Sequence, residues 1–219
     1  LSYNIFGMKK IVITGAMGYI GSELCKIYSG LTNQYEVIAL DRDFYSDRVD
    51  RLNTWGIKFI QCDILDTNKL RNILNDTDIV YHLAGITDVP TTIKDNNSMK
   101  NKEMKNKEIY RVGVEGSKNI INLVGNNTKI VFPSTHTIFE GLENVEKQIS
   151  EKREPLPRLE YAKGKAQTEQ DLISSNKNYV ILRLGSVYGL SNDSTRLNIM
   201  PNLFSKIAAS NGKIKLFSR

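Results

Sequence analysis

A glycine-rich turn near the N-terminus constrains the fold more than any other feature of the sequence. Residues 14–21 carry glycines at positions 15, 18 and 21 and follow an apolar run at 11–13. Gly15 can take a backbone conformation that a side chain would forbid, while Gly18 and Gly21 let a pyrophosphate and the next helix come close. The free N–H groups at the start of that helix would face the phosphates. The pattern predicts a dinucleotide-binding turn between a strand and a helix, with an ordinary loop as the alternative.

Composition limits the classes to which the chain can belong. Hydrophobic residues make up 40% and charged residues 25% of 219 positions, as in soluble globular proteins. No apolar run approaches the roughly 20 residues that cross a bilayer, so we expect no membrane partner. Cys25 and Cys62 lack metal-ligand spacing, which predicts a reduced cytoplasmic protein without a metal. The net charge of +6 comes from scattered lysines and favours phosphorylated small molecules over nucleic acid.

Short β-branched runs alternate with longer helical patterns along the chain. This rhythm predicts an α/β fold, a doubly wound parallel sheet with helices on both faces. A polar segment at 91–107 interrupts the rhythm and is expected to be a mobile surface loop. We expect one domain at 8–184 and the start of a second, small and incomplete, part at 185–219. The expected strands are 11–14, 36–40, 58–61, 79–83, 129–132 and 179–184; the expected helices are 19–29, 67–74, 107–123 and 161–174.

The residues that follow each strand should lie together, because ligands of such sheets bind beyond the carboxyl ends of the strands. Asp41 follows the second strand, about 20 positions after the last glycine, where a carboxylate binds both ribose hydroxyls and repels a 2′-phosphate. Asp41 therefore favours NAD over NADP, although the adjacent Arg42 could pair with a 2′-phosphate. After the third strand, Asp63 could accept from the adenine amino group with Ile64 against the ring; a turn-forming aspartate is the alternative.

The fourth strand ends in residues that would line the path of the cofactor. Leu83 is followed by the small residues Ala84 and Gly85, which would let phosphates and ribose pass close by. His82 lies within the strand itself, and a lone histidine there is more often a hydrogen-bonded core residue than a catalytic base. We therefore expect His82 to belong to the core.

Hydroxyl groups follow the fifth strand, and a tyrosine–lysine pair lies about 25 residues later. Pro133 cannot donate to a sheet ladder, so regular pairing should stop there and leave Ser134 and Thr135 at the edge of the sheet. Tyr161 and Lys165, four apart, lie on one face of a helix. An ammonium group there can lower the tyrosine pKa from about 10 toward neutrality. This predicts Tyr161 as acid/base, Lys165 as its aid and ribose ligand, and Thr135 as the group that holds the substrate oxygen.

These motifs together resemble the extended short-chain dehydrogenase/reductase family, in its NAD-dependent epimerase/dehydratase branch. The similarity runs from Lys9 to about Phe217 and implies a Rossmann-type sheet and bound NAD. It includes the motif at 14–21, the pair Tyr161 and Lys165, and a segment at 114–117 where Gly113 replaces the usual asparagine. The resemblance places further residues as ligands: Tyr19, Ile20 and Leu184 at the cofactor, and Ser134, Thr135, Ser186, Asn198, Ile199 and Phe217 at a nucleotide-sugar substrate, as in UDP-glucose 4-epimerase-like members.

The resemblance implies an NAD-dependent epimerase or related oxidoreductase acting on a nucleotide sugar. His136 and Thr137 stand where sugar 4,6-dehydratases carry an acidic pair, which disfavours a dehydratase. Residues 139–141 are similar to a stretch of the deoxysugar-nucleotide reductases, so that reaction is an alternative. A non-catalytic NAD-binding sensor is another, because family members usually continue about a hundred residues further. The family also implies a homodimer formed through helices 107–123 and 161–174.

Overall fold

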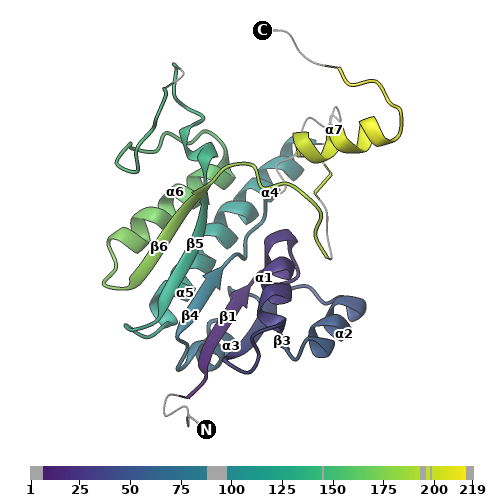
Figure 1. Ribbon diagram of the computed structural model, residues 1–219. Helices are drawn as coiled ribbons and strands as arrows, with labels where there is room; N and C mark the ends of the chain where they lie inside the picture. Colours follow the sequence, from purple (N-terminus) through teal and green to yellow (C-terminus); the bar gives the residue numbers. More distant parts are fainter. Residues whose placement is uncertain (1–6, 88–97, 145, 193–195, 198, 216–219) are drawn as a thin grey trace.

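A six-stranded parallel sheet forms the centre of the computed structural model, which describes residues 7–87, 98–144, 146–192, 196–197 and 199–215 (Figure 1). The strand order is β3-β2-β1-β4-β5-β6, which confirms the expected doubly wound, Rossmann-type fold. The order reverses between β1 and β4, and ligands of such sheets bind at this switch point. The strands are β1 (Lys9–Thr14), β2 (Tyr35–Asp41), β3 (Lys58–Gln61), β4 (Ile79–His82), β5 (Lys129–Thr135) and β6 (Asn178–Leu184).

Helices cover the sheet in two layers, each with its own apolar cluster. On one face, α1 and α2 bring Cys25 and Leu52 against β1, β2 and β3. On the other face, α3, α5 and α6 pack side by side and bring in Leu70, Ile120 and Leu172. The helices are α1 (Tyr19–Ser29), α2 (Ser46–Thr54), α3 (Thr67–Leu74), α4 (Ser98–Arg111), the π-helical η1 (Val112–Gly116), α5 (Ser117–Leu123), the 3-10 turn η2 (His136–Phe139), α6 (Glu160–Ile173) and α7 (Met200–Ala209). None of these described helices is long and apolar enough to cross a membrane.

The first strand is apolar where both of its faces are buried, at residues 11–13. Val12 belongs to the cluster under α3 and α5, whereas Ile11 and Ile13 belong to the cluster under α1 and α2. All three side chains are fully buried. Successive side chains of a strand point to opposite faces, so two covered faces require an apolar residue at every position.

The fifth strand extends further than Pro133 was expected to allow. Pairing with β4 does end at Val131, but pairing with β6 continues through Thr135, which lies opposite Leu184. The prediction that regular pairing stops at Pro133 was therefore wrong on the β6 side. A proline is tolerated at this position because β4 ends at His82 and no longer borders the strand there.

Part of the polar segment expected to be a loop is a helix. Residues 88–97 lie outside the described part, but α4 begins at Ser98 and continues to Arg111, so the loop prediction was wrong for 98–107. Its sequence is mostly polar, the described Met104 is exposed, and Ile109 is buried near its C-terminal end. Lysine and glutamate are good helix formers, and the ion pair of Glu103 with Lys107 at 2.9 Å joins adjacent turns. Propensity and local pairing therefore produced a helix that a search for apolar periodicity missed.

The segment after β6 returns to the first helix (Figure 1). The Tyr19 hydroxyl donates to the carbonyl of Gly189 at 2.7 Å, and the Glu23 carboxylate accepts from the backbone N–H of Asn192 at 2.6 Å. The side chain of Asn202 in α7 accepts from the N–H of Gly189 at 2.9 Å. These bonds attach the C-terminal segment to the helix that follows the glycine turn.

Candidate active site and dinucleotide-binding edge

The glycine turn leaves no room for side chains at two of its three glycines. Gly15 has φ of +67°, and a Cβ there would lie 2.8 Å from the backbone nitrogen of Ala84, two residues beyond the end of β4. A Cβ on Gly21 would overlap the carbonyl oxygen of Gly15. Gly18, in contrast, is exposed at the N-terminal end of α1. The turn thus brings β1, the end of β4 and α1 together and leaves one bare backbone position, Gly18, open at the start of the helix.

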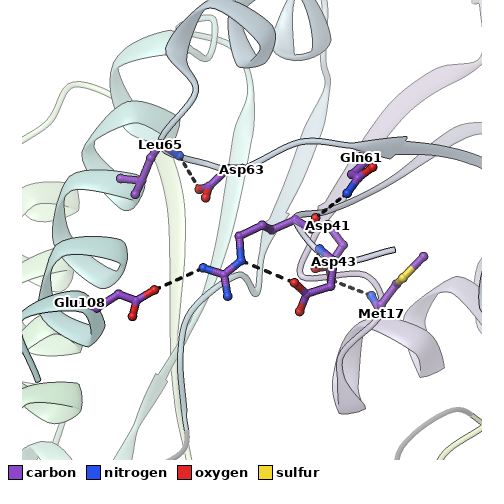
Figure 2. Close-up of polar contacts among 8 residues, drawn as sticks. Met17, Asp41, Asp43, Gln61, Asp63, Leu65 and Glu108 are labelled. Carbon is purple, nitrogen blue, oxygen red and sulfur yellow. Dashed lines mark hydrogen bonds and ion pairs between the residues drawn. The ribbon is translucent and has the colours of Figure 1, made fainter. Parts of the chain in front are cut away.

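Asp41 at the end of β2 is held in a fixed position beside the turn. One carboxylate oxygen accepts from the N–H of Met17 at 3.0 Å and the other from the N–H of Asp43 at 3.1 Å (Figure 2). Burial raises the pKa of Asp41, and these N–H bonds act in the opposite direction. A carboxylate has about four acceptor sites, so two are left for ribose hydroxyls. Residue and position therefore fit the adenine ribose of a dinucleotide without a 2′-phosphate.

The two residues expected at the adenine ring differ in what they can contribute. A carboxylate oxygen of Asp63 accepts from the N–H of Leu65 at 2.9 Å, so Asp63 forms the turn that was its alternative role (Figure 2). The Ile64 side chain is only 3% exposed and packs against Gly116 of the π-helical turn. Most of this side chain is therefore used in packing, and its contact with an adenine ring stays a prediction.

A buried polar network behind the turn confirms His82 as a core residue. Its Nδ1 is 3.0 Å from the Thr14 hydroxyl, and its Nε2 is 2.8 Å from the Ser117 hydroxyl. The Thr14 hydroxyl also accepts from the N–H of Ala84 at 3.1 Å. Burial, assisted by the charge of Lys165, lowers the pKa of His82 to about 3. A neutral His82 therefore joins the glycine turn to β4 and α5.

The chain just beyond β4 is open at Gly85. A Cβ on Gly85 would meet open space, in keeping with a cofactor path past Leu83 and Ala84.

The shifted pKa of His82 predicts a specific pH dependence of stability. The unfolded histidine titrates near 6.5 and the folded one near 3, so the unfolded state binds more protons between these values and stability falls as pH falls through this window. We expect this one group to lower the free energy of unfolding by about 2 kcal/mol between pH 7 and pH 5. Urea denaturation at the two pH values tests this. His82→Asn should lose that part of the pH dependence, whereas His136→Asn, which changes the other histidine of the chain, should retain it.

Two hydroxyl side chains lie at the end of β5, as predicted. Thr135 is 7% exposed, and its hydroxyl lies 3.0 Å from that of Thr137. The Ser134 hydroxyl is buried and has no hydrogen-bond partner among the described residues. Buried hydroxyls normally have a partner, so Ser134 has hydrogen-bonding capacity to offer a ligand.

Tyr161 and Lys165 occupy one face of α6 beside these hydroxyls. The Lys165 ammonium donates to the carbonyl of Pro133 at 2.7 Å and lies 5.9 Å from the centroid of the Tyr161 ring. Burial lowers the pKa of Lys165 to about 8, an effect that Glu169 opposes. Burial also raises the pKa of Tyr161, and the opposing charge is that of Arg196. The expected lowering of the Tyr161 pKa by Lys165 is therefore not found, because the ammonium is directed to the backbone of β5.

The remaining predicted ligands follow β6. Leu184 ends the strand opposite Thr135, Ser186 is exposed just beyond it, and Ile199 caps the N-terminus of α7. Asn198 and Phe217 lie outside the described residues. The charge of Arg196 lowers the pKa of Tyr161 and so opposes the effect of burial. Arg196 was not predicted, because it belongs to no motif in the sequence. Among the described residues, no group of three or more histidine, cysteine, aspartate or glutamate side chains could hold a metal ion.

The fold and this edge define a dinucleotide-binding protein with a tyrosine–lysine pair. Comparison with known proteins narrows the class, because residues 11–219 match the NAD dependent epimerase/dehydratase family. The chain belongs to this family, as the resemblance of its motifs predicted.

Individual relatives are distant and longer. The UDP-N-acetyl-alpha-D-glucosaminuronate decarboxylase of Bacillus cytotoxicus is 28% identical over 134 residues, which are 60% of this chain and 38% of the relative. Among solved structures, one similar protein is a UDP-N-acetylglucosamine 4-epimerase from Methanobrevibacter ruminantium M1, in complex with UDP-N-acetylmuramic acid. The two superpose with a TM-score of 0.72 at 23% identity, over 98% of this chain and 67% of the epimerase chain. A dTDP-glucose 4,6-dehydratase from Bacillus anthracis, in complex with NAD, superposes with a TM-score of 0.74 at 18% identity, over 96% of this chain and 64% of the dehydratase chain. The chain thus spans well under two thirds of the length of the decarboxylase, and the solved structures establish the fold.

Proposed function

We propose that the protein is an NAD-dependent epimerase, or a closely related oxidoreductase, that acts on a nucleotide sugar. One observation carries the proposal: Lys165 on α6 reaches the end of β5, and its charge acts on His82, whose ring lies 3.0 Å from the hydroxyl of Thr14 at the start of the glycine turn. The bond from Lys165 to the carbonyl of Pro133 joins the two elements, two residues before Thr135. Residues 8–184 would form the dinucleotide-binding domain and residues 185–219 the beginning of the substrate-binding part.

The side chains of the site suit proton handling at a sugar hydroxyl. Tyr161 would take the proton of that hydroxyl through its phenolate and return it in the reverse step. Thr135 would hold the reacting oxygen by a hydrogen bond. NAD, when bound, accepts the hydride from the same carbon and supplies it again, which inverts the centre if it returns to the other face. The turn at residues 14–21, Asp41 and Lys165 would hold the dinucleotide in place for this exchange.

Lys165 would serve mainly as a fixed positive charge. With a pKa of about 8, roughly nine in ten molecules carry the ammonium group at pH 7. The bond to Pro133 holds one of its three N–H donors and leaves two for ribose hydroxyls. A bound positive nicotinamide ring and this ammonium together would stabilise the Tyr161 phenolate against the burial that raises its pKa.

The proposal also names a substrate class, a reaction type, a compartment and an oligomeric state. The relatives named above act on UDP- and dTDP-sugars, so UDP-sugars are the first substrates to test. His136 and Thr137, in the position of the dehydratases' acidic pair, favour epimerisation or reduction over elimination. Helices α4, α5 and α6 would form the contact of a cytoplasmic homodimer.

A non-catalytic NAD sensor is the second candidate. The observation that favours it is the raised pKa of Tyr161, since a protonated phenol is a poor base. Calorimetry with NAD and then with UDP-sugars separates the two candidates, with nuclear magnetic resonance used to detect epimerised sugar. Binding of NAD followed by conversion of a UDP-sugar supports the enzyme. Binding of NAD without any sugar binding or conversion supports the sensor, and consumption of NADH with a keto-sugar supports a deoxysugar-nucleotide reductase instead.

A further inference from the structure

The side chain of Arg42 lies between two carboxylates that come from different elements. Its Nε is 3.6 Å from Asp43, just beyond β2, and its Nη1 is 3.6 Å from Glu108 on α4 (Figure 2). All three side chains are about half exposed. Arg42 is the residue that could pair with a 2′-phosphate, so the groups that surround its guanidinium bear directly on the choice between NAD and NADP.

The backbone around Arg42 is fixed as well. Gln61 in β3 donates its amide N–H to the carbonyl of Arg42 at 3.0 Å. On one side of Arg42 in sequence, Asp41 accepts from the N–H of Met17; on the other, the N–H of Asp43 donates back to Asp41. The stem of the Arg42 side chain therefore starts from a defined point, and its guanidinium ends between the two carboxylates.

We propose that Glu108 is a specificity-determining residue for the dinucleotide. By pairing with Arg42, together with Asp43, it holds the guanidinium away from a 2′-phosphate and so disfavours NADP. The proposal rests on the dinucleotide-binding part of the proposed function and does not depend on which sugar is converted.

The charges around the 2′ position support this role. Two carboxylates, those of Asp43 and Glu108, flank the guanidinium of Arg42, and a third, that of Asp41, belongs to the preceding residue, so the guanidinium already has anionic partners. A phosphate ester carries about −1.5 to −2 charges near neutral pH and would have to replace a carboxylate as the partner of Arg42. A 2′-hydroxyl makes no such demand, and NAD is accepted without rearrangement. Because the pairs are half exposed and screened, each carboxylate should change affinity only about two- to fivefold.

Calorimetric titration with NAD and with NADP tests the proposal on the intact protein. Glu108→Gln should lower the dissociation constant of NADP about threefold and leave that of NAD unchanged. Glu103→Gln is the matched control, because Glu103 lies on the same helix, is exposed, and pairs with Lys107 rather than with Arg42. This control should change neither constant. Where direct titration of NADP gives too little heat, displacement of NAD provides the same constant.

A double variant shows whether the effect runs through Arg42. In Arg42→Ala, the further change Glu108→Gln should give no more than a small gain in NADP affinity, since the freed guanidinium is missing. The proposal is overturned if Glu108→Gln behaves like Glu103→Gln, or if its full gain persists without Arg42. Lack of sugar conversion leaves these titrations unaffected, whereas failure of the unaltered protein to bind NAD would refute the proposed cofactor site itself.

Discussion

Replacing Tyr161 with phenylalanine is expected to reduce sugar conversion by about 10³-fold while leaving NAD affinity nearly unchanged. The substitution removes only the phenol oxygen, which is the group proposed to exchange a proton with the sugar hydroxyl. The ring itself stays, so its packing beside Lys165 and the position of α6 should persist. An effect confined to turnover therefore separates proton transfer from binding. Initial rates measured by nuclear magnetic resonance, together with NAD titration, provide both quantities.

The control for this variant is another tyrosine on a neighbouring helix. Tyr110 lies on α4, is 38% exposed and has no proposed role in the chemistry, so Tyr110→Phe removes the same atom from a tyrosine outside the proposed mechanism. It should keep wild-type turnover. If Tyr161→Phe converts sugar as fast as Tyr110→Phe, the acid/base role of Tyr161 is wrong. Its phenol then stays protonated throughout, as its raised pKa indicates. A parallel loss of NAD affinity in Tyr161→Phe would point instead to a structural role.

The strands could be predicted from the sequence because short β-branched and apolar runs mark them, most clearly in β1 and β2, whose later residues are buried. The predicted range 58–61 coincides with β3, and each of the other five was correct to within a few residues. Besides α4, two further helices were missed, for opposite reasons. In α2 a single buried residue, Leu52, gives too weak an apolar stripe. In α7 the stripe exists, but Met200 and Leu203 are exposed, and the loss of strand–helix rhythm after Leu184 hid the helix.

The candidate site could be predicted only where chain order and spatial order coincide. Asp41 and Thr135 are each the last residue of a parallel strand, and all such strand ends meet at one edge, so topology alone places them. Contacts between distant elements have no such rule. The burial of Ile64 under Gly116, the direction of the Lys165 ammonium and the proximity of Arg196 to Tyr161 each depend on packing between elements far apart in sequence. Glu108 belongs to the same group, because only the fold brings α4 beside the end of β2.

The largest loss of stability is expected from Arg183→Met. Arg183 in β6 donates to both carboxylate oxygens of Glu169 in α6, at 2.7 to 3.2 Å, and Glu169 is completely buried. Arg183 also donates to the carbonyl of Glu151 at 2.9 Å and lies 5.4 Å from the ring of Phe139, so it joins the segment before α6 to the sheet. Without it, a carboxylate would stay buried unpaired. Breaking such a pair costs about 3–5 kcal/mol, measured as the free energy of unfolding in urea.

A second ion pair of the chain separates the effect of burial from that of geometry. Arg153 donates to both carboxylate oxygens of Glu146 at 2.8 and 2.9 Å, but both side chains are close to 40% exposed. Arg153→Met should leave the urea midpoint almost unchanged, since water can solvate the carboxylate that remains. Equal losses from the two methionine variants would mean that the bidentate contact, rather than desolvation of Glu169, provides the stability.

The double variant Arg183→Met, Glu169→Met separates the cost of the buried charge from the loss of the other contacts of Arg183. Removing the buried carboxylate along with its partner should recover most of the stability lost in Arg183→Met, because neither charge of the pair is then left without the other. If the loss persists, the bond of Arg183 to Glu151 and its contact with Phe139 are the stabilising interactions. Recovery of stability without recovery of turnover would be informative about Lys165. Glu169 raises the pKa of that lysine, so its removal should reduce the fraction of Lys165 that carries the ammonium group on which the proposed chemistry depends.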